Sequence, residues 1–178
     1  MSVVNLLPKL ETPDADVEQF KLSMRHLAGA VSVITVGQGD ERTGFTATSV
    51  SSLSVEPPSI LVSLNRNSSS WPVVKRYGVF AVNILAHDQQ HIADRFAGRG
   101  GVKGVERYEG AQWKQLASGV SGLSDALVVL ECELEEAIER HSHSILIGRV
   151  QSVTLRDEAE PLLYWHGRYR QIVAHAEA

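Results

Sequence analysis

Residues 43–71 constrain the fold of this chain most strongly, because they are patterned like β-sheet and are crowded with hydroxyl side chains. The pattern predicts one long strand, a break at Glu56-Pro57-Pro58, and a second strand over residues 59–64, since proline cannot donate to a sheet ladder. Alternate residues of a strand share a face, so small and hydroxyl-bearing residues can line one side of a planar ligand. The stretch is therefore either a ligand-binding wall or a solvated, threonine-rich strand face.

Three serines, Ser68-Ser69-Ser70, come at the end of this stretch and precede a short helix predicted over residues 71–77. Pro72 fits the first turn of that helix, and Gly78 fits its C-cap. The unpaired N–H groups and positive dipole end of a helix bind anions, and Arg66 adds a positive charge, so the segment suits a phosphate. Ordinary N-capping is the alternative, although it needs only one of the three serines.

The whole chain predicts a single domain that is mainly β with few short helices. Antiparallel connections and regular turn signals favour a closed or nearly closed barrel over a doubly wound parallel sheet. We expect residues 1–16 to form an N-terminal arm and residues 17–175 to form the domain. The other expected strands are 31–36, 79–85, 127–138, 143–155, 162–165 and 169–173, and a second short helix is expected over 88–96.

Two further segments carry specific expectations. Asp14 or Asp16 can cap a helix that runs to about residue 27 and gathers apolar side chains on one face, namely Val17, Phe20, Met24, Leu27 and Ala28. The glycine-rich residues 97–110 are expected to form a mobile loop, which carries Arg99, Lys103 and Arg107.

Composition argues against several classes of protein. The net charge is −4 and no cluster of Lys and Arg appears, so neither nucleic acid nor an anionic membrane surface is an expected partner. The single cysteine, Cys132, permits no intramolecular disulfide and is expected to be a packed thiol. No stretch approaches the ~20 apolar residues of a membrane span, and the N-terminus lacks the pattern of a secretory signal. We therefore expect a cytoplasmic protein.

Familiar catalytic and nucleotide-binding motifs are missing from the sequence. There is no Walker A pattern, no Gly-x-Ser-x-Gly elbow, and no Gly-x-Gly-x-x-Gly between a strand and a helix. His87 and His91 share a helical spacing of four, but no third ligand accompanies them, so no metal site is expected. His141 and His143 point the same way on an extended segment, either as a metal pair or as one functional histidine beside an incidental one.

Taken in order, several blocks of the sequence resemble the flavin reductase components of two-component monooxygenases, which share a split β-barrel, FMN-binding fold. The blocks span about residues 17–173. No single block identifies the family, but their order and spacing together are specific to it. They are residues 20–35, residues 44–54 with Glu56-Pro57-Pro58, Ser68-Ser69-Ser70-Trp71, residues 80–85, Arg95-Phe96-Ala97, residues 161–164 and Gly167-Arg168-Tyr169.

This resemblance implies a set of site residues. Thr46, Ala47, Thr48, Ser49, Val50 and Ser51 would line the isoalloxazine ring and ribityl chain, and Ser63, Leu64 and Asn65 would contact them from the next strand. Ser68 and Ser70 would hold phosphate, and Phe96, Ala97 and Tyr169 would lie near the flavin. His143 takes the position of the family histidine beside the nicotinamide, but Ser142 replaces the family aspartate and His141 the family glycine.

The resemblance also implies the activity. An NAD(P)H-dependent flavin reductase would transfer a hydride from NADH or NADPH to FMN or FAD and supply reduced flavin to a partner monooxygenase, acting as a homodimer. The change at Ser142 motivates one alternative, a flavin-binding carrier or sensor without reductase turnover. Another alternative is a split-barrel flavin oxidase that acts on its own substrate.

Overall fold

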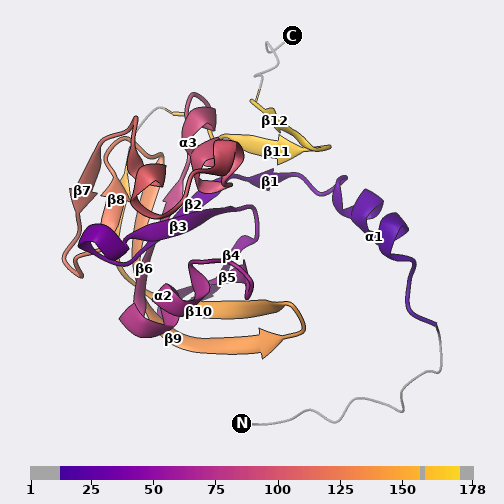
Figure 1. The fold of residues 1–178 in the computed structure, drawn as a ribbon, viewed down its shortest axis with the longest axis horizontal. Coiled ribbons are helices and arrows are strands. Elements are labelled where there is room, and N and C mark those ends of the chain that lie inside the picture. The colour runs from indigo at the N-terminus through magenta and orange to yellow at the C-terminus, as the bar shows by residue number, and fades with distance from the viewer. Residues whose placement is uncertain (1–12, 157–158, 173–178) are drawn as a thin grey trace.

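The computed structural model describes residues 13–156 and 159–172, so most of the predicted N-terminal arm lies outside the described residues (Figure 1). The chain is mainly β with short helices, as predicted. The helices are α1 (Val17–Met24), α2 (Trp71–Tyr77) and α3 (Gln90–Phe96), with 3-10 turns η1 (Gly39–Glu41), η2 (Arg99–Gly101) and η3 (Gly104–Tyr108). The strands are β1 (Gly29–Ala30), β2 (Ser32–Val36), β3 (Thr43–Ala47), β4 (Val50–Val55), β5 (Pro58–Asn65), β6 (Val79–Ile84), β7 (Trp113–Gln115), β8 (Ser121–Leu123), β9 (Val128–Arg140), β10 (His143–Leu155), β11 (Leu163–Trp165) and β12 (Arg168–Arg170).

Seven strands form one curved antiparallel sheet in the order β3-β2-β6-β9-β10-β5-β4. Its two edge strands, β3 and β4, are consecutive in sequence and are joined by only two residues, Thr48 and Ser49. So short a link between opposite edges requires the sheet to curl until those edges meet. The sheet is thus split at one seam instead of being hydrogen-bonded into a closed barrel.

The prediction of one long strand over residues 43–55 is wrong. The first part pairs with β2, where Thr46 opposes Val33, and the second part pairs with β5, where Val50 opposes Val62. Because the two parts have different partners, the strand breaks at Thr48 and Ser49 although neither residue is a glycine or proline. The break depends on tertiary pairing rather than on local propensity.

Two hydrophobic clusters pack against the curved sheet. All five residues of β2 are buried, so this strand contributes to both clusters, as a near-continuous apolar run predicts. A buried amide, Asn83, ties β8 to the sheet, since its side chain donates to the Val33 carbonyl at 2.9 Å and accepts from the Leu123 N–H at 2.7 Å. These bonds satisfy both ends of the amide in a place that water does not reach.

Residues 97–110 were expected to be a mobile loop, but they are bonded to the body of the protein. The guanidinium of Arg107 donates to the carbonyls of Gly44 and Phe96, and burial lowers its pKa from the ordinary value. Arg95 donates to the carbonyls of Glu106 and Arg107 and to the Glu109 carboxylate. Hydrogen bonds from arginine side chains, and not strand pairing, thus hold this segment in place. The number of glycines in the segment does not indicate such bonds.

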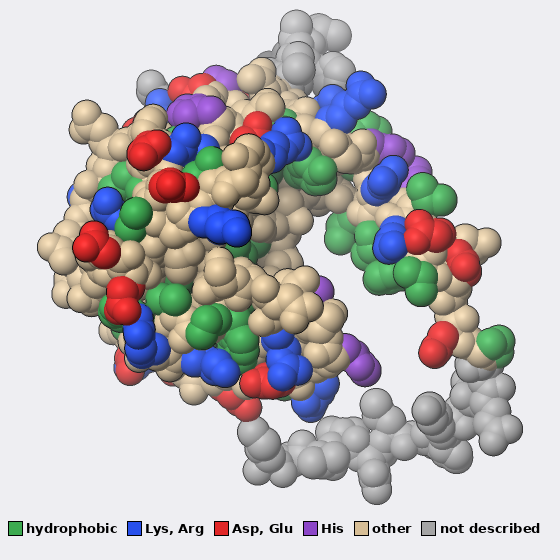
Figure 2. Space-filling view, in the orientation of Figure 1, with side chains coloured by type: hydrophobic (Ala, Val, Ile, Leu, Met, Phe, Trp, Pro, Cys, Tyr) green, Lys and Arg blue, Asp and Glu red, His purple; other side chains and the backbone are tan. Residues whose placement is uncertain are grey.

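Helix α1 projects from the sheet and buries none of its residues (Figures 1 and 2). Asp16 caps it by accepting the Gln19 N–H at 2.8 Å, and it ends at Met24, three residues earlier than predicted. Val17, Phe20 and Met24 are exposed on it, and Leu27 is exposed just beyond it. Among the described residues, no helix is both long and apolar enough to span a membrane.

Candidate flavin site

A cavity of about 230 Å³ opens where β3 ends at the seam of the sheet. Five of its lining residues were predicted as ligand contacts, and they come from three distant segments: Thr46, Ala47, Thr48, Ala97 and Tyr169. Val31, Arg99 and Tyr164 complete the lining. A threonine strand, two alanines and two tyrosines therefore meet around one space, which suits a flat ligand with a polar edge.

Strand β3 determines where the polar side of the cavity lies. As an edge strand, it leaves alternate backbone groups without a sheet partner. Near its start these groups are occupied, since Tyr108 donates to the Thr43 carbonyl and Ser70 and Arg107 donate to the Gly44 carbonyl. Near its end the strand borders the cavity instead. The Thr46 hydroxyl donates to the Ala93 carbonyl at 2.6 Å, so this side chain fixes β3 to α3.

A second groove, of about 430 Å³, is also lined by Thr48. Ser49 and Val50 line it together with Met24 and Leu27 from the α1 region. The Ser49 hydroxyl donates to the Ser63 carbonyl at 3.1 Å, which joins the seam to β5. The cavity and the groove share Thr48, so a ligand longer than the cavity can continue across the seam.

The predicted contacts on β4 and β5 have different orientations. Ser63 is half-buried and Asn65 is exposed, whereas the Leu64 side chain is buried in the core. Ser51 is exposed on β4, opposite Leu61. The pattern follows from the period of two along a strand.

The serine turn before α2 is less open than the sequence indicates. Ser70 is fully buried, and its hydroxyl donates to the Gly44 carbonyl at 3.0 Å, so it does not cap α2 with its side chain. The Ser70 N–H donates to the Ser68 hydroxyl at 3.2 Å, and the Trp71 N–H donates to the Ser68 carbonyl. Of the two predicted phosphate contacts, Ser68 is half-exposed and Ser70 serves to attach this turn to β3.

His143 lies at the tip of the β9–β10 hairpin, opposite Asn65 of β5. Its Nδ1 lies 2.9 Å from the Ser142 hydroxyl, so the serine that replaces the family aspartate still hydrogen-bonds the imidazole. The side chain is exposed and lines neither the cavity nor the groove at the seam. The structure therefore brings His143 beside the predicted β5 contacts and not beside Tyr169.

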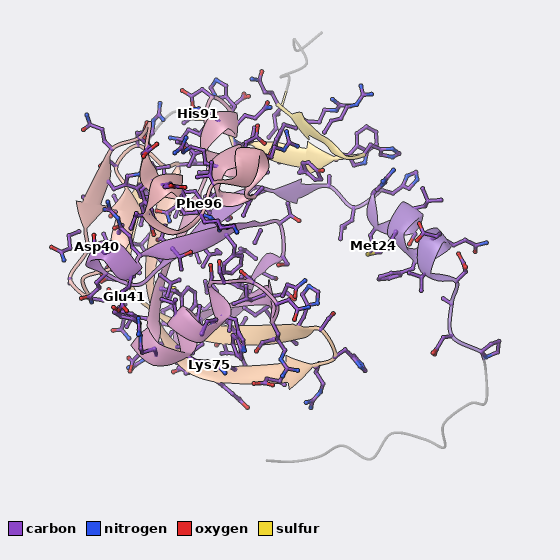
Figure 3. All side chains as sticks on the ribbon, viewed as in Figure 1. Met24, Asp40, Glu41, Lys75, His91 and Phe96 are labelled. Atoms are coloured by element: carbon purple, nitrogen blue, oxygen red, sulfur yellow. The ribbon has the colours of Figure 1, made fainter. Side chains whose placement is uncertain are left out.

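Phe96 and Ala97 are neighbours in sequence but differ in environment. Phe96 lies in the core of the protein (Figure 3). Its ring packs against Tyr108 at 5.1 Å between centroids. Ala97 lines the cavity. Phe96 therefore supports the wall from behind, and Ala97 forms part of it.

Tyr169 belongs to a small polar cluster at the cavity. Its hydroxyl donates to Asp94 Oδ1 at 3.0 Å, and burial, with help from this carboxylate, raises its pKa to about 12. Arg99 lies 3.2 Å from the same carboxylate oxygen. Tyr164 packs edge-on against Tyr169 at 5.4 Å between ring centroids. Sequence reasoning did not assign Arg99 or Tyr164 to the site, although an arginine between glycines and a tyrosine in a strand were both visible in the sequence.

No group of three or more metal-ligating side chains is found within residues 13–156 and 159–172. The polar strand edge, small residues and tyrosines that line the cavity are typical of a site for an organic ligand.

The fold and the cavity together define a split-barrel protein with a ligand site at its seam. The chain belongs to the family described as "Flavin reductase like domain", whose model matches residues 24–173. The predicted family and the predicted split-barrel fold are thereby confirmed.

Relatives and solved structures agree with this assignment. The FMN reductase (NADH) RutF 2 of Rhizobium rhizogenes is 34% identical over 165 residues, which cover 93% of this chain and 94% of the relative. The FMN reductase (NADH) RutF 2 of Methylorubrum extorquens is 40% identical over 151 residues, covering 85% and 87% of the two chains.

Two solved structures are similar along most of the chain. BorF, the flavin reductase component of a bacterial two-component tryptophan halogenase, has a TM-score of 0.82 and 31% identity, covering 90% of this chain and 100% of BorF. The NADH:FAD oxidoreductase SgcE6 of Streptomyces globisporus, in complex with NAD and FAD fragments, has a TM-score of 0.83 and 28% identity, covering 91% and 96%.

Proposed function

We propose that this protein is an NADH-dependent flavin reductase that transfers a hydride from NADH to FMN. The observation that carries the proposal is the convergence of Thr46, Thr48, Ala97 and Tyr169 on one cavity at the seam. Two relatives whose names specify FMN and NADH support the same reaction. FAD and NADPH remain further candidate substrates of the same site, and SgcE6 supports FAD.

The residues at the seam fit a flavin by shape and by polarity. Ala47 and Ala97 leave room for a ring to approach, and Tyr169 offers an aromatic wall. The cavity is smaller than most cofactor sites, which hold roughly 300–1,000 Å³, so the ligand would extend over Thr48 into the neighbouring groove. Ser49, Val50, Ser51, Ser63 and Asn65 would then contact the ribityl chain, and Ser68 with its turn would contact the phosphate.

The protein's part in the reaction is orientation and polarity. Hydride transfer belongs to the bound flavin and nicotinamide and needs no side-chain acid or base. The edge of β3 would donate hydrogen bonds to the polar rim of the ligand and stabilise negative charge that develops there. Tyr169, which stays protonated at neutral pH, adds a neutral wall. His143, which the family resemblance assigns to the nicotinamide, lies on the β9–β10 hairpin outside the cavity, so contact would require the dinucleotide to extend to that hairpin.

The experiment is a steady-state assay with purified protein, NADH and FMN, followed at the nicotinamide absorbance band. Flavin-dependent oxidation of NADH is the expected result, and replacing NADH by NADPH and FMN by FAD measures the breadth of the site. Tight flavin binding without NADH oxidation would contradict the proposal and favour the carrier or sensor. Flavin reduction that requires some other small molecule would favour the oxidase.

We also propose the context of the reaction. Reduced flavin would pass to a separate monooxygenase in the cytoplasm, and BorF, a component of a two-component system, supports such a division of labour. The protein would act as a homodimer, for which the exposed apolar face of α1 is supporting evidence.

A further inference from the structure

Arg99 differs chemically from every other residue around the cavity. It is the only charged side chain among the described residues that line the space, where its companions are threonine, tyrosine and small apolar residues. Asp94 pairs with one edge of the Arg99 guanidinium, and the donors that remain favour a ligand that carries negative charge nearby. The flavin ring is not such a ligand before it is reduced, whereas nucleotide phosphates always are.

Three arginines come from α3 and the segment after it, and only one is directed to the cavity. Arg107 is committed to main-chain carbonyls of Gly44 and Phe96. Arg95 is committed to carbonyls of Glu106 and Arg107 and to the Glu109 carboxylate. Arg99 has a single carboxylate neighbour, Asp94, and its side chain is 60% exposed. The first two arginines hold the segment in place, so a structural role does not account for Arg99.

The position of Arg99 is nevertheless well determined. It lies between Gly98 and Gly100, whose φ angles of 78° and 72° form a turn that other residues adopt only with strain. Asp94 Oδ1 lies 3.2 Å from Arg99 Nη1 and also accepts the Tyr169 hydroxyl at 3.0 Å. The guanidinium carbon is 5.8 Å from the centre of the Tyr169 ring. These contacts occupy one side of a planar group that has five N–H donors, leaving others for an incoming oxyanion.

We propose that Arg99 binds a phosphate of the nicotinamide dinucleotide, and that Asp94 positions it to do so. The inference rests on the proposed function, which assigns the flavin phosphate to the turn at Ser68. Arg99 lines the cavity with Tyr169 and Ala97, and Ser68 does not line it. The planar guanidinium fork matches phosphate oxygens better than an ammonium group does. Arg99 is therefore a specificity-determining residue, and Asp94 is a positioning residue.

The test measures binding without turnover. NAD⁺ is titrated into FMN-loaded protein by calorimetry, and FMN and riboflavin are titrated separately by flavin fluorescence. Arg99→Gln is expected to raise the NAD⁺ dissociation constant about tenfold, the loss typical of one hydrogen bond to a charged group. Arg99→Lys is expected to recover part of that loss. FMN and riboflavin are expected to lose less affinity than NAD⁺, and by equal factors, because Arg99 lines the cavity for the ring and not the turn assigned to the flavin phosphate. Arg168→Gln, an exposed arginine on β12 outside the cavity, is the matched control.

The variant Asp94→Asn tests whether Asp94 positions the Arg99 side chain, because it leaves the charge of Arg99 in place. The amide keeps an oxygen that accepts the Tyr169 hydroxyl but removes the ion pair with Arg99, so we expect a smaller rise in the NAD⁺ dissociation constant, about threefold, as for a weak surface ion pair. Salt should weaken NAD⁺ binding to the unaltered protein more steeply than to Arg99→Gln.

An unchanged NAD⁺ dissociation constant in an Arg99→Gln protein that still reduces FMN would overturn the inference and leave the proposed function intact. A loss confined to FMN, with riboflavin unaffected, would also overturn it, because Arg99 would then hold the flavin phosphate. Failure of the unaltered protein to oxidise NADH in the presence of FMN counts against the proposed function alone, since NAD⁺ binding is measured independently.

Discussion

At the scale of single residues, the two serines predicted to hold phosphate have different environments and should respond differently to mutation. We expect Ser68→Ala to weaken FMN binding several-fold and riboflavin binding hardly at all, because only FMN carries the phosphate. Ser70→Ala should instead lower the free energy of unfolding by about 1–2 kcal/mol, since its buried hydroxyl bonds the Gly44 carbonyl. Flavin titrations and urea unfolding measure the two effects.

Ser70→Ala serves as the control for Ser68→Ala. Ser70→Ala protein that remains folded should bind FMN and riboflavin with similar, modest losses. Equal losses for FMN and riboflavin in Ser68→Ala would instead remove the phosphate assignment at this turn.

Tyr169 gives a prediction about pH. Its pKa of about 12 reflects burial first and the Asp94 carboxylate second, so Asp94→Asn should lower that pKa while leaving it above the ordinary 10.0. The folded protein holds this proton more tightly than the unfolded chain, so stability falls as pH rises from 10.0 towards 12. Tyrosinate absorbance of the variant, compared with the unaltered protein, should therefore increase within that window. Identical titration curves would show that Asp94 does not influence the phenol.

At the scale of elements, the contact between β3, β2 and α3 determines where the site forms. A Cβ on Gly44 would lie 2.3 Å from the Ile34 carbonyl oxygen and 2.6 Å from the Phe96 ring. A ring can shift, but a strand carbonyl cannot, so Gly44→Ala should lower the free energy of unfolding by about 1–3 kcal/mol. The shift of β3 should also weaken flavin binding, because Thr46 and Thr48 move with it.

Gly122→Ala on β8 is the matched control for Gly44→Ala. A Cβ there would meet side-chain atoms of Leu116 and Val129 at 3.0 and 3.1 Å, and these can move. Chemical denaturation should show a smaller loss than for Gly44→Ala, with flavin affinity retained. A Gly44→Ala protein as stable as Gly122→Ala would contradict the packing argument.

The elements also show how far the sequence determines the structure. Strand β5 and helix α2 follow from local signals, namely an apolar run after two prolines and a helix bounded by Pro72 and Gly78. The break at Thr48 does not, because it arises from the change of partner between β2 and β5. The sequence did not predict the short β7–β8 hairpin for a similar reason. Its strand β8 is held by a hydrogen bond to the buried side chain of Asn83, which lies far away in the sequence.

The sequence likewise predicted some residues of the candidate site and not others. Residue types made the threonine strand visible, and the family resemblance supplied Ala97 and Tyr169, which the structure brings to the same cavity. Arg99 could not be placed from sequence, because its orientation depends on a glycine turn and on Asp94 in α3. Ser70 looked like an anion contact because a serine at a helix start usually caps, and only the packing of β3 shows otherwise.

At the scale of the whole molecule, several large apolar side chains among the described residues are exposed on the single chain. Val17, Phe20 and Met24 form one apolar face of α1. Figure 2 shows hydrophobic side chains gathered on this helix, which stands away from the body of the protein. Others lie on β4, at Leu53 and Val55, and on β10, at Val153 and Leu155, two strands that β5 separates in the sheet. Exposed apolar surface of this extent is typical of an interface. A second copy of the chain is the occupant that we expect on the α1 face.

We therefore expect size-exclusion chromatography with light scattering to give twice the chain mass of 19.5 kDa. Phe20→Glu combined with Met24→Glu should shift the protein to the monomer, because a buried unpaired carboxylate is costly. Leu22→Glu is the control, since it is exposed on the same helix but points about 200° away from Phe20 at 100° per residue. A double variant that stays dimeric, or a control that dissociates equally, would exclude this face of α1. Since Met24 also borders the groove beside Thr48, the double variant should bind flavin more weakly than the unaltered protein does.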